Sequence, residues 1–123
     1  MQDPFDPGIA IGEIVLTGLA GSRTEIMSGD YLPMKTADGY MIRATQRRVL
    51  ERYDDAIADY DQAISLAPTR GDIHFEKAQT YAAMERREAA VLTFEVAAAL
   101  LTKAGSEKAS AARRWVRRLQ QMQ

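Results

Sequence analysis

The sequence predicts an all-α fold, in which two helical hairpins stack as a short α-solenoid and a single capping helix follows. The main observation is a small–aromatic–small pattern that recurs thirty-four residues later. Its members are Ala56, Tyr60 and Ala63, which recur as Ala90, Phe94 and Ala97. The same step relates Asp38 to Asp72 to Ser106, Ala44 to Ala78 to Ala112, and Arg47 to Tyr81 to Trp115. A period of this length is typical of helical hairpins that bury their apolar faces against their neighbours.

Length and composition limit the classes of function. The 123 residues correspond to one small domain, and a hydrophobic fraction of 46% is normal for a globular protein. A net charge of −1 gives no overall attraction to nucleic acid or to a membrane, so we expect neither as a partner. The absence of cysteine excludes disulfide bonds and thiolate chemistry. The first residues do not resemble a secretory signal, so the expected location is cytoplasmic.

Residues 1–36 do not follow the repeat, and we expect them to be irregular or partly helical. The segment 3–8 is rich in turn-forming residues, and the apolar stretch Ile9–Ala20 is interrupted by Glu13. The spacing of the apolar residues leaves helix and strand both open, and the stretch is too short to span a bilayer. Two repeats are fewer than the three usually needed for stability. We therefore expect this segment to cover the first repeat, in the same chain or in a second copy.

The first repeat, residues 37–70, is predicted to hold two helices. Asp38 is the expected N-cap of the first, which would run to about Glu51, because a carboxylate can accept an amide of the first turn. The second helix is predicted from about Tyr53 to Leu66, where apolar residues recur at helical spacing. Pro68 follows it and cannot continue a helix.

The second repeat, residues 71–104, and a capping helix within 105–121 complete the prediction. Asp72 is expected to start a helix that ends near Met84, and the next helix should run from Arg86 or Arg87 to Thr102 or Lys103. Gly105 suits the left-handed turn that closes a helix. Ser106 would then cap a final helix that ends near Gln121. The apolar residues of this final helix share one side, and its arginines lie on the other. The apolar set is Ala109, Ala112, Trp115, Val116, Leu119 and Met122, and the basic set is Arg113, Arg114, Arg117 and Arg118.

The pattern resembles the tetratricopeptide repeat family, whose second helix carries the same small–aromatic–small spacing and then a proline. Pro68 matches that proline in the first unit, whereas Thr102 replaces it in the second. The first helices depart from the family, since Arg43 and Lys77 stand where leucine is expected and Arg47 stands at an aromatic position. The resemblance covers 37–104 as two repeats and 105–121 as a lone helix. It implies a scaffold that binds another protein or peptide, without catalytic residues, cofactor or metal.

In this family the first helices line a groove that holds an extended peptide or a partner helix. Carried over by register, the partner-binding positions are Met41, Thr45, Arg48, Phe75, Glu76, Gln79 and Arg113, with Ile42, Ala82, Ala109 and Ser110 beside them. The lysine, asparagine and arginine set that clamps acidic chaperone tails in some members is absent here. A mixed apolar and polar lining instead suits an apolar or amphipathic segment of a partner protein.

The remaining polar residues have structural interpretations in the sequence. His74, the single histidine, has no partner residues for a metal site or a triad and should lie near a helix-packing seam. The acidic residues Asp54, Asp55, Asp59 and Asp61 are predicted to form a solvated helix face. The arginines of the last helix should form a solvated cap, and the alternative is contact with phosphate, an acidic partner or an acidic membrane. The leading function is an adaptor or assembly scaffold. The alternatives are a homo-oligomerising domain, such as a homodimer, and an accessory fragment of a larger enzyme.

Overall fold

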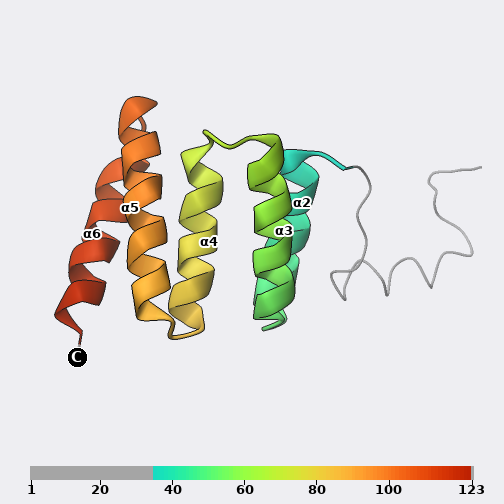
Figure 1. Cartoon of the computed structure of the whole chain (residues 1–123), viewed down its shortest axis with the longest axis horizontal. Helices are drawn as coiled ribbons and strands as arrows, with labels where there is room; N and C mark the ends of the chain where they lie inside the picture. The colour runs from blue at the N-terminus through green and yellow to red at the C-terminus, as the bar shows by residue number, and fades with distance from the viewer. Residues whose placement is uncertain (1–34, 123) are drawn as a thin grey trace, which may run out of the picture. The chain divides into compact units, whose positions relative to one another are not determined.

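A computed structural model describes residues 35–122, which are helical apart from short turns. The helices of this part are α2 (Ala37–Val49), α3 (Tyr53–Leu66), α4 (Gly71–Ala83), α5 (Arg87–Lys103) and α6 (Lys108–Gln121). Each helix packs against the next one in the chain. Figure 1 shows α3, α4 and α5 side by side, with α2 behind α3 and α6 behind α5. The predicted all-α fold of two hairpins and a final helix is confirmed. The predicted N-terminal segment lies outside the described residues, apart from Lys35 and Thr36.

The repeat is visible in the helix boundaries. Helices α2 and α4 begin and end thirty-four residues apart, and α3 and α5 also begin thirty-four residues apart. Helix α5 then continues three residues beyond Leu100, the equivalent of the last residue of α3. Thr102 replaces the proline of the first unit, and its amide allows the helix to continue. As a result α6 begins three residues later than the repeat would place it.

The N-caps of α2 and α4 differ from the sequence prediction. Thr36 caps α2, because its hydroxyl accepts the backbone amide of Gly39 at 3.0 Å. Helix α4 has Arg70 at the N-cap position and no side-chain cap. The prediction that Asp38 is an N-cap is therefore wrong, and Asp72, which is expected to start a helix, is the second residue of α4. Both carboxylates lie in the first turn, where they face the positive end of the helix.

The C-terminal ends of α2, α4 and α5 share one geometry. Each is followed by a left-handed residue, namely Glu51 (φ 62°), Glu85 (φ 61°) and Gly105 (φ 72°). At each end, the amide of the left-handed residue and the amide that follows it donate hydrogen bonds to carbonyls of the last helical turn. These bonds satisfy carbonyls that have no partner within the helix. The predicted closure at Gly105 is confirmed, and α2 ends two residues before Glu51. The predicted cap Ser106 lies one residue before the N-cap position of α6, and its hydroxyl accepts the amide of Lys108 at 3.1 Å.

Two clusters of buried side chains form the interior. The first core joins α2, α3 and α4 and consists of Ala44, Ala56, Tyr60, Ala63 and Ile73. The second core joins α4, α5 and α6 and consists of Ala78, Ala90, Phe94, Ala97, Ala98, Leu101, Ala109, Ala112 and Leu119. The six residues of the small–aromatic–small repeat are all fully buried. Small residues at these positions let the helices approach closely.

Candidate functional site

Arg43 and Arg47, two arginines that break the repeat pattern, bind one buried carboxylate. Arg43 donates to both oxygens of Asp59 at 2.9 Å, and Arg47 donates to Oδ2 of the same carboxylate at 3.0 Å. Asp59 is only 3% exposed, so the prediction that it belongs to a solvated acidic face is wrong. Asp54 and Asp61, by contrast, are exposed as predicted. Such charge-assisted bonds satisfy a carboxylate that would otherwise be unfavourable in the interior. The network therefore joins α2 to α3.

Three of the predicted groove residues support the interior. Met41 packs against the first core. The Thr45 hydroxyl donates to the Met41 carbonyl at 3.0 Å and lies 3.2 Å from the Tyr60 hydroxyl. Phe75 packs edge to face against Phe94, with ring centres 5.4 Å apart. Each of the three is half-buried.

Arg48 and Glu76 join α2 to α4. Their side chains form an ion pair at 3.0 Å, and Arg48 also donates to the Glu76 carbonyl at 3.4 Å. The hydroxyl of Tyr60 lies near this pair. Burial raises the pKa of Tyr60 above its ordinary 10.0, and the hydrogen bond with Thr45 and the charge of Arg48 oppose part of that rise. The phenol therefore stays protonated at neutral pH.

An open cavity of about 550 Å³ lies beside this ion pair, between the C-terminal halves of α2, α4 and α6. We call it the three-helix pocket. It is lined by Arg48, Val49, Gln79, Ala82, Ala83, Trp115, Leu119 and Met122. Val49 is 74% exposed and Met122 is 52% exposed, so apolar side chains at its rim face solvent. Of the residues predicted for partner binding, Arg48 and Gln79 line this pocket.

A second cavity, of about 650 Å³, continues the three-helix pocket toward the turn between α4 and α5. The two cavities share Ala82, Leu119 and Met122. Arg87, at the start of α5, donates to the carbonyl of Met122 and so holds the end of α6 beside the second cavity. The two cavities are therefore adjacent on the surface.

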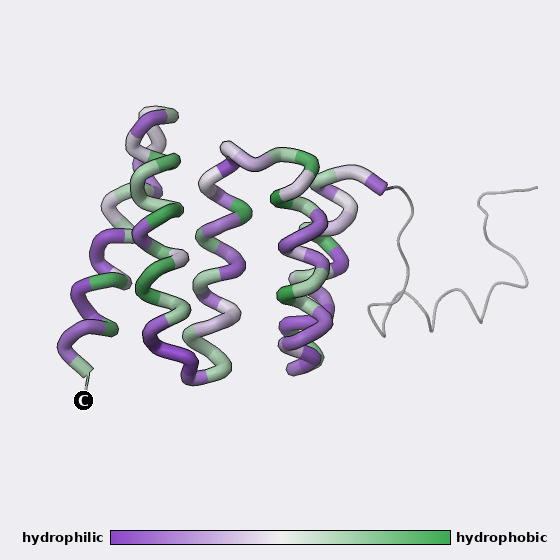
Figure 2. The backbone as a smooth tube through the Cα atoms, viewed as in Figure 1, coloured by the Kyte–Doolittle hydropathy of each residue, from purple (hydrophilic) through white to green (hydrophobic). Residues whose placement is uncertain are grey.

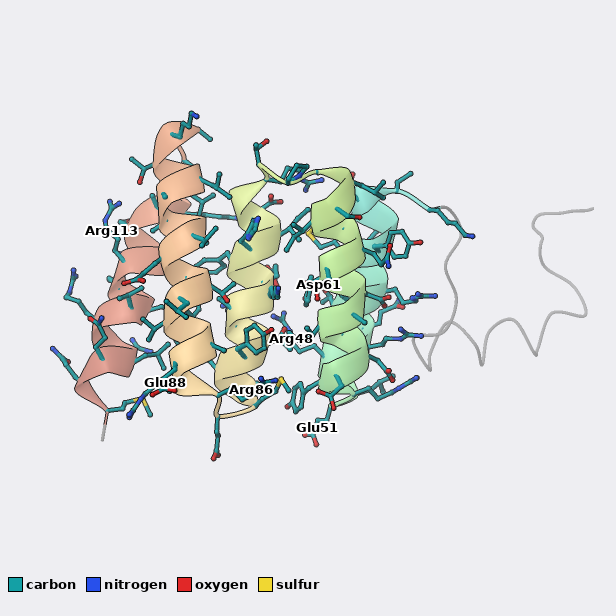
Figure 3. The ribbon with its side chains drawn as sticks, viewed as in Figure 1. Arg48, Glu51, Asp61, Arg86, Glu88 and Arg113 are labelled. Carbon is teal, nitrogen blue, oxygen red and sulfur yellow. The ribbon has the colours of Figure 1, made fainter. Side chains whose placement is uncertain are left out.

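Arg113 lies apart from the other predicted groove residues. Its guanidinium donates to the Thr102 hydroxyl at 3.0 Å, and it lines a cavity of about 290 Å³ between α5 and α6. Figure 3 shows Arg113 far from Arg48, on the outer side of α6. The burial of Ala112 and Leu119 fixes the rotation of α6. This rotation turns Trp115, Leu119 and Met122, instead of Arg113, toward the pocket. The apolar side of α6 on a helical wheel is the sequence signal for this arrangement.

Trp115 links the second core to the basic surface of α6. Its ring stacks on Phe94, with centres 5.2 Å apart and planes 8° apart. The guanidinium of Arg118 lies over the same ring, 5.3 Å from its centre. Helix α6 contains no acidic residue, and its arginines are exposed. The rim of the pocket near Trp115 is therefore positively charged.

His74 and the possible metal ligands are the other candidates for a chemical site in residues 35–122. The His74 ring nitrogen Nε2 lies 3.2 Å from the Pro68 carbonyl, at the turn before α4. Within these residues no three histidine, aspartate or glutamate side chains are grouped so that they could hold a metal ion. No helix of the same part has the length and apolar character needed to cross a bilayer. Comparison of the chain with protein-family models and with curated proteins finds no match.

Proposed function

We propose that the protein is a tetratricopeptide-like adaptor that holds a segment of another protein in the three-helix pocket. The observation that carries the proposal is an open apolar cavity bounded by the alternate helices α2, α4 and α6. Ala82 and Ala83 give the cavity its depth, because larger side chains at these positions would fill it. Exposed apolar side chains grouped in a hollow are typical of protein-binding surfaces.

The pocket fits an amphipathic segment with apolar anchors and acidic flanking residues. Trp115, Leu119 and Met122 offer apolar surface to the anchors. Arg118 lies on the Trp115 ring and has no acidic neighbour on its own helix, so it can pair with an acidic residue of the segment. Complementary charge at the rim favours association and selects among partners.

Docking would be passive, because the pocket is already formed and needs little rearrangement. The adaptor would therefore bring proteins together without a chemical step of its own. The absence of cysteine suits a reducing compartment, and we propose the cytoplasm as the location.

Trp115 provides a direct test because it is the only tryptophan of the chain. We would titrate the protein with short synthetic amphipathic peptides that share one apolar face and differ only in having acidic, neutral or basic flanks. The peptide with acidic flanks should change the fluorescence emission of Trp115 at a lower concentration than the other two peptides do. Added salt should weaken the binding of this peptide.

Val49 and Leu66 provide matched variants, since each is the last residue of its helix and each is exposed. Val49→Glu should weaken binding of the acidic-flanked peptide roughly tenfold or more, because it places at the apolar rim a charge that repels the acidic flanks. Leu66→Glu, outside the pocket, should leave binding unchanged. Equal affinity of both variants, or no preference for acidic flanks, would contradict the proposal. Phe75→Ala is a poorer test because Phe75 also packs on Phe94.

A further inference from the structure

The outward face of α5 is apolar and uncovered in the described part of the chain. Leu92 is 65% exposed and Val96 is 46% exposed, and Ala99 is exposed on the same face. Their spacing of four and then three residues places them in one row along the helix. Exposed charges stand at the two ends of this row, Glu88 at the start and Lys103 at the end. We call this row of five residues the α5 stripe.

The first repeat provides an internal comparison, because α3 occupies the equivalent place. The residues of α3 and its following turn that match the stripe are Asp54, Ala58, Gln62, Ser65 and Thr69, all exposed. None of them is a large apolar residue, so the fold itself does not require apolar residues at these positions. Leu92 and Val96 are therefore specific to the second repeat.

The opposite face of α5 is buried in the second core through Ala90, Phe94, Ala97 and Leu101. The middle of α5 thus carries apolar residues on both faces, and Figure 2 shows that most residues of this stretch are hydrophobic. A helix that is apolar all round is normally buried on all sides. The α5 stripe therefore resembles a surface that becomes buried when proteins associate.

We propose that the α5 stripe is a self-association surface, on which α5 of one copy lies antiparallel to α5 of a second copy. Positions 88 and 103, and positions 92 and 99, are symmetric about the midpoint between Glu95 and Val96. A twofold axis at that point places Leu92 opposite Ala99 of the second copy, so a large side chain faces a small one. It also places Glu88 opposite Lys103 of the second copy. Such self-complementarity is what a twofold interface requires.

The charges near the axis are compatible with this pairing. Glu88 and Lys103 form no ion pair within residues 35–122, so both remain available to a second copy. Glu95, beside the axis, lines the same cavity as Arg113 and Arg117. These cations offset the repulsion between the Glu95 side chains of the two copies. A different partner protein would have no reason to match this symmetric order of charge and size.

The first test is the mass of the full chain in solution, measured by light scattering after size exclusion across a wide range of concentration. We expect the mass to rise with concentration toward twice the 13.7 kDa of one chain. Val96→Glu should keep the protein at the mass of one chain, because it places two like charges at the centre of the interface. Leu66→Glu replaces another exposed aliphatic residue, at the end of α3, and should still associate. Circular dichroism should show the same helical content for both variants.

Charge reversal tests the antiparallel order. Glu88→Lys or Lys103→Glu alone should weaken association several-fold, and the double variant should restore it, because each pair again has opposite charges. A monomer at all concentrations would overturn the proposal, as would a dimer that Val96→Glu leaves intact. Failure of the double variant to restore association would overturn the antiparallel arrangement. Val49→Glu should leave the mass unchanged, which separates this surface from the three-helix pocket.

Discussion

Glu51 and Glu85 occupy equivalent turns in the left-handed region of backbone conformation, which favours glycine. A residue with a side chain is destabilised by about 1–2 kcal/mol in this conformation. Both glutamate side chains are exposed. Glu51→Gly and Glu85→Gly should therefore each raise the free energy of unfolding by roughly 0.5–1 kcal/mol, after the entropy of glycine is subtracted. Urea unfolding measures this change, and the double variant should show the sum, because the turns belong to separate hairpins.

Gly105 provides the converse control for these turns. Its φ is 72°, and nothing lies within 4 Å of an added Cβ, so Gly105→Ala would change the backbone energy alone. This variant should lower the free energy of unfolding by about 1 kcal/mol. If Glu51→Gly destabilised the protein as much as Gly105→Ala does, the left-handed turn after α2 would be contradicted.

Arg70 joins the two repeats by binding the equivalent residues Asp38 and Asp72, each at 2.7 Å. Its hydrogen bond to Asp72 lowers the pKa of that carboxyl below its ordinary 3.8, although burial opposes the shift. A depressed carboxyl pKa contributes stability that is present above pH 3.8 and is lost as the pH falls through the folded-state value. The ion pair should therefore stabilise the protein at neutral pH and weaken in acid.

Asp72→Asn tests this dependence. The variant should melt below the wild type at neutral pH, and the difference should shrink as the pH is lowered past 3.8, because the wild-type carboxyl then becomes neutral as well. Asp54→Asn, an exposed position in the first turn of α3, is the control for removing a first-turn carboxylate that Arg70 does not bind. A constant difference between Asp72→Asn and the wild type across the acid range would exclude the ion pair as its cause.

At the scale of the elements, each hairpin depends on small residues where its helices cross. Ala56 and Ala90 are fully buried in the first and second core. Ala56→Leu or Ala90→Leu should lower the free energy of unfolding by about 1–3 kcal/mol, because the larger side chain forces the helices apart. Ala58→Leu, at an exposed position of α3, should change stability little. A thermal melt unaltered by both core substitutions would contradict the packing of the hairpins.

The helices themselves could be predicted from the sequence, but their ends and rotations could be predicted only in part. The repeat identified all of the described helices, because burial of a periodic apolar face decides where a helix forms. The N-cap of α2 was misassigned because Thr36 and Asp38 both have a side chain that can accept an amide. The rotation of α6 follows its own apolar face, so the family register carried over to Arg113 did not bring it to the pocket.

At the scale of the whole molecule, the candidate site could be predicted only where the repeat register continues. Arg48 and Gln79 lie on α2 and α4, whose boundaries repeat, and both line the three-helix pocket. The burial of Asp59 required tertiary information, since its partners Arg43 and Arg47 lie on another helix. The arginines at apolar positions were the signal that a buried carboxylate was needed.

The two cores differ in size. The first consists of five buried residues, with Tyr60 and Ile73 as its large side chains, whereas the second consists of nine, includes Phe94, Leu101 and Leu119, and contacts Trp115. The stability of a repeat protein is roughly a sum over units and their interfaces, so the two ends need not open together. Amide hydrogen exchange should therefore be faster in α2 and α3 than in α5. Slower exchange in the first hairpin would contradict this order.

The difference between the two cores has a consequence for the three-helix pocket, because the walls of this pocket come from both ends of the row of helices. Val49 belongs to the first hairpin, whereas Trp115 and Leu119 belong to the last helix. When the first hairpin opens, the pocket loses one wall while the other two remain in place. A bound segment would favour the closed form and slow amide exchange in α2, a helix far along the chain from Trp115. The local unfolding of one hairpin would thus set how often all three walls of the pocket are in place.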